Sequence, residues 1–466
     1  MTIDRLVWTI LNEALAVYRD SPRASHWLRM HLARFEEPVR IAVAGLPGSG
    51  KSTVVNALIG EQLAPIDGFA WYRDGASPRA QVFAPHGPPQ EVPIVKRDGR
   101  PRVELGAWRG QQVDRVVVDW PTRTLRDAIL IDTPATATPE QVFGEADAVL
   151  YLMRHMHSAD LRLLQTAHDH AIARTAAVNT VVVLSRADEI GAGRIDALSS
   201  AKQIARRYRR DVHVQPLCQN VVAVAGLLAI AGRTLHEKEF AALGALAALP
   251  RADLEDHLLS ADRFVGPDFP VALGADVRQG LVERFGIFGV RLTTTLIRQG
   301  FNTQVKLTGQ LLQRSGLSEL RDAMGLYFTE RREVLKARSA LLALDVVLRM
   351  EARPAARKLV TDLERALASA HEFRELRLVA ALQSGRTKLP GDLDAEALRL
   401  VGGQGTNPLA RLGMEYEPDE SELREAIFDA LDRWQEHAEN PVLDNAQRQA
   451  ASVVVRSCEG MLAALP

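Results

Sequence analysis

The segment from Gly45 to Ser52 carries the residue types that bind phosphate. It reads Gly-Leu-Pro-Gly-Ser-Gly-Lys-Ser and follows the apolar run Ile41–Ala44, and a helical segment is predicted over Val54–Ile59. A strand, a glycine-rich turn and a helix N-terminus in this order form the P-loop, in which successive main-chain N–H groups surround a phosphate. Glycine allows the backbone to approach the anion closely. The sequence therefore predicts a phosphate site, with a chance match in a glycine-rich turn as the alternative.

The side chains of this segment have separate expected roles. Lys51 is predicted to reach the β- and γ-phosphates, and the Ser52 hydroxyl to take one position around Mg²⁺. The residues predicted to contact the phosphates are Gly45, Gly48, Ser49, Gly50, Lys51, Ser52 and Thr53.

A carboxylate follows a second buried run. Asp132 ends the stretch Ile129–Asp132 and is followed by Thr133-Pro134-Ala135. An oxygen ligand at the end of a buried strand suits the holding of Mg²⁺, so Asp132 joins Ser52 in the predicted metal site. An aspartate that only caps a turn is the alternative.

The choice of base depends on Arg186 and Asp188, which follow the apolar run Val181–Leu184. Guanine presents two adjacent N–H donors that one carboxylate can accept, and adenine does not, so Asp188 is predicted to select GTP over ATP. The aliphatic part of Arg186 is predicted to lie along the plane of the base. A surface salt bridge between the two residues is one alternative, and a P-loop ATPase or kinase, indifferent to Asp188, is another.

These motifs together resemble those of bacterial dynamin-like GTPases, and most closely the actinobacterial isoniazid-inducible type. The resemblance rests on Lys51–Gly60, Asp132–Pro134 and Leu184–Arg194, and it spans nearly the whole chain. It implies a large GTPase that binds GTP or GDP with Mg²⁺ and remodels membranes. It also implies a homodimer, or a heterodimer with a related dynamin-like chain, formed across the nucleotide face.

Three departures from that pattern affect hydrolysis. The first-switch segment, Leu63–Tyr72, is short, and no threonine occurs between Val54 and Pro121; Asp67 is the one candidate metal ligand there. The second switch has Ala135 in place of glycine and only Thr136–Asp147 before the next strand, with a capping box predicted at Thr138–Gln141. Pro47-Gly48 stands where eukaryotic dynamins carry a polar pair that orients water, and Pro47 has neither a side-chain donor nor an N–H.

We therefore expect nucleotide binding to be retained and hydrolysis to be slow, with the catalytic residues unknown. One hypothesis is a dynamin-like GTP-binding protein that acts at membranes with a related partner. The other is a catalytically degenerate GTPase-fold scaffold, or a regulatory subunit of an active paralogue.

The elements that position these residues follow from hydrophobic periodicity. Strands are predicted at Arg40–Ala44, Val113–Trp120, Ala128–Asp132, Ala148–Met153, Thr180–Leu184 and Val221–Ala225, the second and third forming an antiparallel ribbon at the sheet edge. Helices are predicted at Phe285–Ile297, Thr303–Arg314, Leu317–Leu348, Ala355–Ala370, Glu420–Glu436 and Leu443–Leu465. The fold class is an α/β P-loop GTPase domain with a mostly parallel sheet, plus an all-α helical stalk.

We expect three regions along the chain. N-terminal helices over 1–36 should pack with the stalk, the GTPase domain should span 37–235, and the helical stalk should span 236–466. The basic cluster Arg206–Arg210 is interpreted as a solvated helix end in preference to a lipid or nucleic-acid patch.

Composition supports an ordinary globular protein, with 47% hydrophobic residues and 25% charged residues. The net charge of −1 gives no overall field that would recruit nucleic acid, which is not expected as a partner. The longest apolar stretch, Val221–Gly232, is shorter than the roughly 20 residues that span a bilayer, so any lipid contact is expected to be peripheral. Two distant cysteines, Cys218 and Cys458, are typical of reduced thiols, so we expect a cytoplasmic protein that contacts at most the inner face of the cell membrane.

Overall fold

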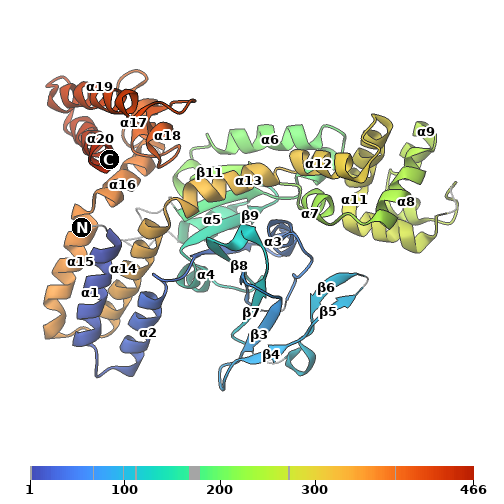
Figure 1. The fold of residues 1–466 in the computed structure, drawn as a ribbon, viewed down its shortest axis with the longest axis horizontal. Coiled ribbons are helices and arrows are strands. Elements are labelled where there is room, and N and C mark those ends of the chain that lie inside the picture. Colours follow the sequence, from blue (N-terminus) through green and yellow to red (C-terminus); the bar gives the residue numbers. More distant parts are fainter. Residues whose placement is uncertain are drawn as a thin grey trace.

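The computed structural model describes residues 3–66, 68–97, 99–110, 113–166, 179–270, 273–383 and 385–465. A nine-stranded sheet lies in the middle of the molecule (Figure 1), in the order β11-β10-β9-β1-β8-β2-β7-β3-β4. Its strands are β1 Val39–Gly45, β2 Ala70–Asp74, β3 Arg79–Phe83, β4 Gln90–Val92, β7 Arg115–Trp120, β8 Ala128–Asp132, β9 Ala148–Met153, β10 Thr180–Leu184 and β11 Asn220–Ala223. A separate hairpin pairs β5 Ile94–Arg97 with β6 Arg100–Val103.

The centre of the sheet is parallel and buried on both faces. β1 pairs in parallel with β8 on one side and β9 on the other, and β9 and β10 continue the parallel order. All residues of β8, β9 and β10 are buried, which explains their continuous apolar runs. The predicted mixed α/β fold with a mostly parallel sheet is confirmed.

The predicted antiparallel ribbon of Val113–Trp120 with Ala128–Asp132 is wrong. β2 lies between β7 and β8, parallel to β7 and antiparallel to β8. β2 occupies part of the expected first-switch segment, where Ala70 pairs with Asp132. β2 has a weak sequence pattern and was not predicted, because only its first three residues are buried and the strand lacks alternation. Asp67 lies outside the described residues.

The helices before and within the sheet domain are α1 Ile3–Val17, α2 Pro22–Ala33, α3 Lys51–Ile59, α4 Pro139–Glu145, α5 Ser158–Thr166 and α6 Ala197–Tyr208. Those that follow the last strand are α7 Gly226–Thr234, α8 Glu237–Ala247, α9 Arg251–His257, α10 Ala261–Val265, α11 Ala275–Arg298, α12 Gln304–Arg314 and α13 Leu317–Met324. The rest are α14 Arg332–Met350, α15 Arg357–Ser369, α16 His371–Gln383, α17 Leu393–Leu400, α18 Pro408–Leu412, α19 Glu420–Glu439 and α20 Asn445–Ala464.

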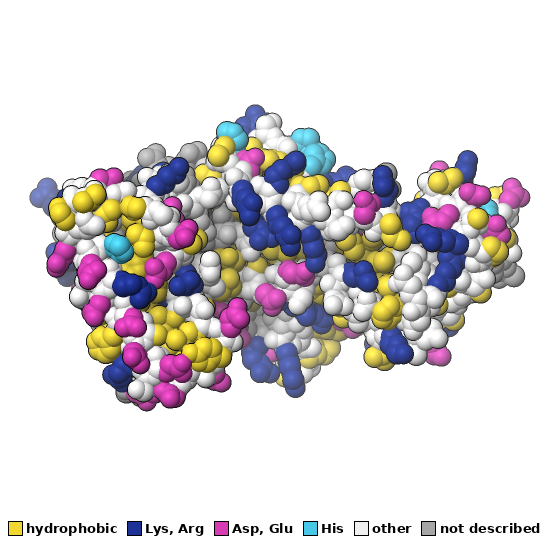
Figure 2. Space-filling view, turned by 90° about the horizontal axis from the view of Figure 1, so that it is seen from above, with side chains coloured by type: hydrophobic (Ala, Val, Ile, Leu, Met, Phe, Trp, Pro, Cys, Tyr) yellow, Lys and Arg dark blue, Asp and Glu magenta, His cyan; other side chains and the backbone are white. Residues whose placement is uncertain are grey.

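Short helical turns connect several of these elements, namely η1 Gly106–Trp108, η2 Arg123–Leu125, η5 Ala187–Ala192, η6 Gln215–Leu217, η7 Gly325–Thr329 and η8 Pro354–Ala356. The π-helical turn η7 divides the predicted helix Leu317–Leu348 into α13 and α14. Residues Arg206, Arg207, Arg209 and Arg210 are exposed at the end of α6, as expected of a solvated helix end. Figure 2 shows Lys and Arg side chains gathered near the middle of the face seen from above.

Four hydrophobic clusters hold the chain together. One cluster lies on one side of the sheet with residues of α6 to α12, and a second includes residues of α3, α7 and α13. The third joins α1 and α2 to α14 and α15, and the fourth joins α16, α17, α19 and α20 (Figure 1). No helix in the described part of the chain has both the length and the apolar character that crossing a bilayer requires.

The N-terminal helices are tied to distant parts of the chain. Leu11 of α1 is fully buried with Leu341 and Leu344 of α14. At the end of α2, the Arg34 guanidinium donates to one carboxylate oxygen of Asp147 at 3.0 Å. Apolar packing and this buried ion pair therefore connect the first helices both to the helical half and to the sheet.

We predict that Leu11→Ala lowers the free energy of unfolding by about 2–5 kcal/mol, because a buried leucine is replaced by a cavity. Trp8→Ala on the same helix is the control, since Trp8 is 51% exposed and surface changes usually cost within about 0.5 kcal/mol. Denaturant unfolding followed by circular dichroism measures both. Equal losses in the two variants would contradict the packing of α1 on α14.

Candidate nucleotide-binding site

The glycine-rich loop after β1 has the backbone conformation that the motif requires. Gly45, Gly48 and Gly50 have φ of 147°, 74° and 86°, and α3 begins directly afterwards at Lys51. A Cβ atom on Gly45 would lie 2.3 Å from the carbonyl oxygen of Leu152 on β9. Glycine is therefore required at this position by contact with the neighbouring strand, and not only by its φ.

The Lys51 ammonium lies across the loop. Its Nζ donates to the carbonyl oxygens of Gly45 at 2.9 Å and Leu46 at 3.4 Å. Burial lowers the pKa of Lys51, and the charge of Asp132 opposes that shift. This cation is thus held at the mouth of the loop, beside the N-terminus of α3, where a polyphosphate would bind.

Ser52 and Asp132 form the predicted metal pair. The Ser52 hydroxyl donates to Oδ2 of Asp132 at 2.7 Å, and Oδ1 is buried without a hydrogen-bond partner in the described part of the chain. Burial raises the pKa of Asp132 to about 6. A hydroxyl and a carboxylate with a spare oxygen are the hard ligands that Mg²⁺ prefers, so these residues fit the ion.

Two neighbours of Asp132 help to define the site. The Thr133 hydroxyl donates to the carbonyl of Val43 at 2.9 Å, so it is engaged with β1. The Tyr72 hydroxyl of β2 is buried and has no partner among the described residues, and burial together with the charge of Asp132 raises the pKa of Tyr72. Tyr72 was not predicted as a site residue, because its approach to Asp132 depends on the unpredicted pairing of β2 with β8.

The predicted base-reading residues follow β10. Asp188 is 5% exposed, and burial raises its pKa to about 6. Arg186 has a φ of 51°, and its guanidinium pairs with Glu189 at 2.6 Å. Glu189 also pairs with Arg154 at 2.6 Å. Arg186 therefore forms its ion pair with Glu189, at the rim of the predicted base site. The alternative of a surface salt bridge between Arg186 and Asp188 is not seen.

The two parts of the site lie at the same edge of the sheet. Lys51 and Ser52 follow β1, Asp132 ends the adjacent β8, and Asp188 follows β10, with β9 between β1 and β10. Two strand spacings separate β1 from β10 by about 10 Å, a gap that an extended nucleotide can bridge. The carboxyl ends of parallel strands are where α/β sheets bind their ligands. Thr53 of α3 lies beside the start of α7, where a Cβ atom on Gly226 would be 3.1 Å from Cγ2 of Thr53.

The connection after Asp132 is short and tightly held. The capping box predicted at Thr138–Gln141 is present, and it opens α4. At the other end of α4, the Arg34 guanidinium donates to the carbonyl oxygens of Gly144 and Glu145, each at 3.1 Å. The helix of the predicted second switch is thus capped at its start by its own residues and bonded at its end by Arg34, which follows α2.

Comparison with known proteins gives a relative over the full length of the chain. No family model matches the chain. Two solved structures of an oligomerised bacterial dynamin pair, described as sensing and tethering membranes, match with TM-scores of 0.34 and 0.33 at 12% identity. They cover 98% and 99% of this chain and 75% and 74% of theirs, and scores this low support no conclusion.

The isoniazid-induced protein IniC of Mycobacterium tuberculosis, from strains CDC 1551 / Oshkosh and ATCC 25618 / H37Rv, is far closer in sequence. It is 37% identical over 488 residues, covering 99% of this chain and 98% of its own length. The chain therefore belongs to the family of the isoniazid-induced protein IniC, which confirms the isoniazid-inducible type that its motifs indicate.

Proposed function

We propose that this chain is a dynamin-like GTP-binding protein that holds GTP or GDP with Mg²⁺ and acts in membrane remodelling or maintenance with a related partner chain. The observation that supports the proposal best is the placement of Lys51, Ser52 and Asp132 at one edge of the sheet, with Asp188 two strands away. This arrangement provides a phosphate site and a base site at nucleotide spacing. The subcellular location that fits this function is the cytoplasm, with peripheral contact at the inner face of the cell membrane.

In this proposal, each residue has one role. Loop amides and Lys51 bind the β- and γ-phosphates, and Ser52 with Asp132 would hold Mg²⁺, which would neutralise phosphate charge. Asp188 accepts two N–H groups of guanine. Arg186 is held by Glu189 at the rim, with its aliphatic part available to the base.

Hydrolysis is expected to be slow, because groups that position water or stabilise charge are absent. Pro47 is exposed and has no N–H to offer. Thr133 bonds to Val43 and does not replace the missing switch threonine. Removal of one charge-stabilising donor commonly costs about 10²–10³-fold in rate.

The same features favour a second candidate function, a catalytically degenerate scaffold or regulatory subunit of an active dynamin-like paralogue. Both candidates bind nucleotide, and they differ in turnover. Single-turnover GTP hydrolysis, measured with and without lipid vesicles and partner, distinguishes them. Ordinary GTPase rates from the isolated chain would exclude the scaffold.

Titration of the chain with fluorescently labelled GTP and GDP in the presence of Mg²⁺ tests the proposal. We predict saturable binding that Lys51→Ala abolishes, since the variant loses the cation that faces the phosphates. Lys96→Ala, an exposed lysine on β5, is the control and should bind as the wild type does. Absence of any binding by the wild-type chain would end the proposal.

Asp188→Asn is predicted to weaken GTP binding and to relax base selectivity. An amide accepts only one of the two guanine N–H groups, and its own N–H₂ faces the other. The same amide suits xanthine, which has a carbonyl in place of the second donor, so the ratio of XTP to GTP affinity should rise by about tenfold or more. Competition binding with GTP, XTP and ATP measures it. An unchanged guanine preference would remove Asp188 from the base site.

Lowering the pH is predicted to weaken the binding of GTP. Asp132 and Asp188 each have a pKa of about 6, and both must be ionised to act. The dissociation constant should therefore be flat above pH 7 and rise as the pH falls through 6, by about tenfold per pH unit for each required carboxylate. Asp188→Asn carries one titrating group fewer and should show a shallower rise. Equal slopes in the two proteins would count against Asp188.

A further inference from the structure

Helix α11 is kinked beside the proposed base site. Gly286, within Ala275–Arg298, has φ 66° and ψ 168°, values outside the helical region. This region of conformation is essentially restricted to glycine. The helix therefore consists of two segments, Ala275–Phe285 and Ile287–Arg298, joined at a residue that only glycine can occupy without strain.

The kink lies beside the Asp188 carboxylate. A Cβ atom on Gly286 would lie 3.8 Å from Oδ2 of Asp188 and 3.6 Å from Cδ1 of Leu227. Both are ordinary van der Waals distances, so a methyl group at this position would touch the carboxylate and Leu227. Leu227 follows β11 at the start of α7. Asp188 is 5% exposed.

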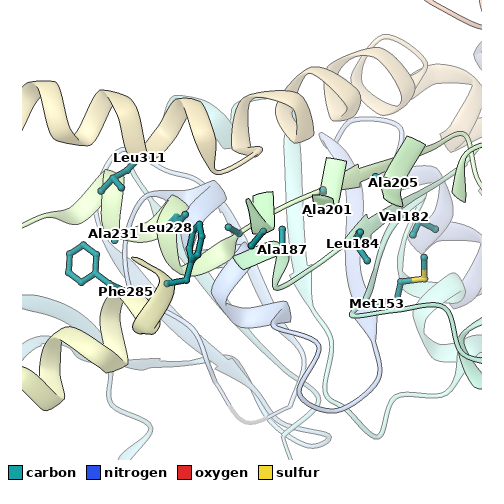
Figure 3. Close-up of a cluster of buried hydrophobic side chains, with 14 of the residues drawn as sticks. Met153, Val182, Leu184, Ala187, Ala201, Ala205, Leu228, Ala231, Phe285 and Leu311 are labelled. Carbon is teal, nitrogen blue, oxygen red and sulfur yellow. The ribbon is translucent and has the colours of Figure 1, made fainter. Parts of the chain in front are cut away.

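Both segments of α11 are held in place. Before the kink, Arg284 donates to the hydroxyl of Thr234 at 2.8 Å, and Phe285 is buried near Leu228 and Ala231 in the cluster shown in Figure 3. After the kink, Arg291 donates to the carbonyl of Gly193 at 2.7 Å. A Cβ atom on Gly193 would lie 3.6 Å from Cβ of Phe288. The turn that carries Asp188 is thus hydrogen-bonded, through Gly193, to the segment of α11 that follows the kink.

We propose that α11, from the helical half of the chain, forms one wall of the guanine pocket, and that Gly286 is the residue that positions the Asp188 carboxylate. The inference rests on the proposed GTP-binding function and adds a specificity-determining residue to it. A wall beside the carboxylate limits its orientations and its access to water. A hydrogen bond in such an environment is stronger, and a wrong base leaves a buried carboxylate unpaired, which is costly.

Gly286→Ala tests the wall, with Gly280→Ala on the same helix as a matched control. A Cβ atom at Gly280 meets nothing within 4 Å, and Gly280 has no left-handed φ. Alanine cannot keep the kink, so the segments are expected to realign and uncover Asp188. Competition binding should show the preference of Gly286→Ala for GTP over ATP lowered by about tenfold. Its loss of GTP affinity in acid should begin at a lower pH than in the wild type, because an exposed carboxylate has a lower pKa.

Gly280→Ala should match the wild type in selectivity and in pH profile. If Gly286→Ala also matches the wild type in both, the wall is excluded. If wild-type protein binds no guanine nucleotide, the proposed function fails as a whole. If the wild type binds and only the Gly286 result is negative, this inference alone fails.

A cross-link provides a second test that does not depend on how Gly286→Ala folds. The distance at Gly193 and Phe288 suits a disulfide, whose Cβ atoms are about 3.5–4.5 Å apart, and the native Cys218 and Cys458 are both buried. The double variant Gly193→Cys/Phe288→Cys locks α11 to the turn. A fixed wall predicts the same GTP affinity in its oxidised and reduced forms, with Phe288→Cys alone as the oxidant control. Loss of GTP binding on oxidation, restored by reductant, would show that α11 must move away, and would overturn the proposal.

Discussion

The site depends on one close approach between two main chains, that of Gly45 to the carbonyl oxygen of Leu152. No side chain fits between them. The loop after β1 therefore packs directly against β9, without help from a ligand. The position of α3 follows from this contact, and with it the positions of Lys51 and Ser52. Because β1 lies between β8 and β9, Asp132 arrives at the same edge from the other neighbour. The order of the strands in the sheet therefore brings Lys51, Ser52 and Asp132 together.

The buried charges at this edge are costly to the isolated fold. Lys51, Asp132 and Asp188 all have pKa values shifted by burial toward their neutral forms. Asp132 and Asp188 occur in different parts of the site, yet each is enclosed by apolar strands or helix backbone. Perturbed groups that converge on one sheet edge are characteristic of functional sites. A ligand with phosphates at one end and paired N–H donors at the other would offset both costs.

Much of this architecture can be predicted from the sequence, for a physical reason. Strands buried on both faces are continuous apolar runs, and Ala128–Asp132, Ala148–Met153 and Thr180–Leu184 have the same bounds in prediction and structure. The strands β2 to β6 are short and partly exposed, so their patterns are weak. The place of β2 between β7 and β8 depends on pairing between distant segments, which no local pattern encodes.

The residues of the candidate site also fall into two groups, those that the sequence predicts and those that it does not. Lys51, Ser52, Asp132 and Asp188 belong to local motifs and can be read along the chain. Tyr72 and Leu227 reach the site through tertiary contacts and cannot. Gly286 left one signal, a glycine inside the predicted helix Phe285–Ile297, where it costs about 1 kcal/mol relative to alanine. Such a residue calls for a packing or conformational reason, and the φ of 66° and ψ of 168° at the kink supply it.

Binding and hydrolysis depend on different parts of this molecule. The proposed binding groups stand on the sheet edge or on α3, where the core fixes them, whereas hydrolysis needs switch segments that can rearrange around the γ-phosphate. Here α4, the helix of the proposed second switch, is capped at its start by Thr138 and Gln141 and bonded at its end by Arg34, which follows α2. Displacement of the end of α4 would have to break these hydrogen bonds or move Arg34, which follows α2, a helix packed on α14. Helix α11 is bonded to the turn that carries Asp188, whereas Arg34, which follows α2, is bonded to Asp147 at the amino ends of β1 and β9, away from the proposed site. Any coupling between nucleotide and helices must act in both directions.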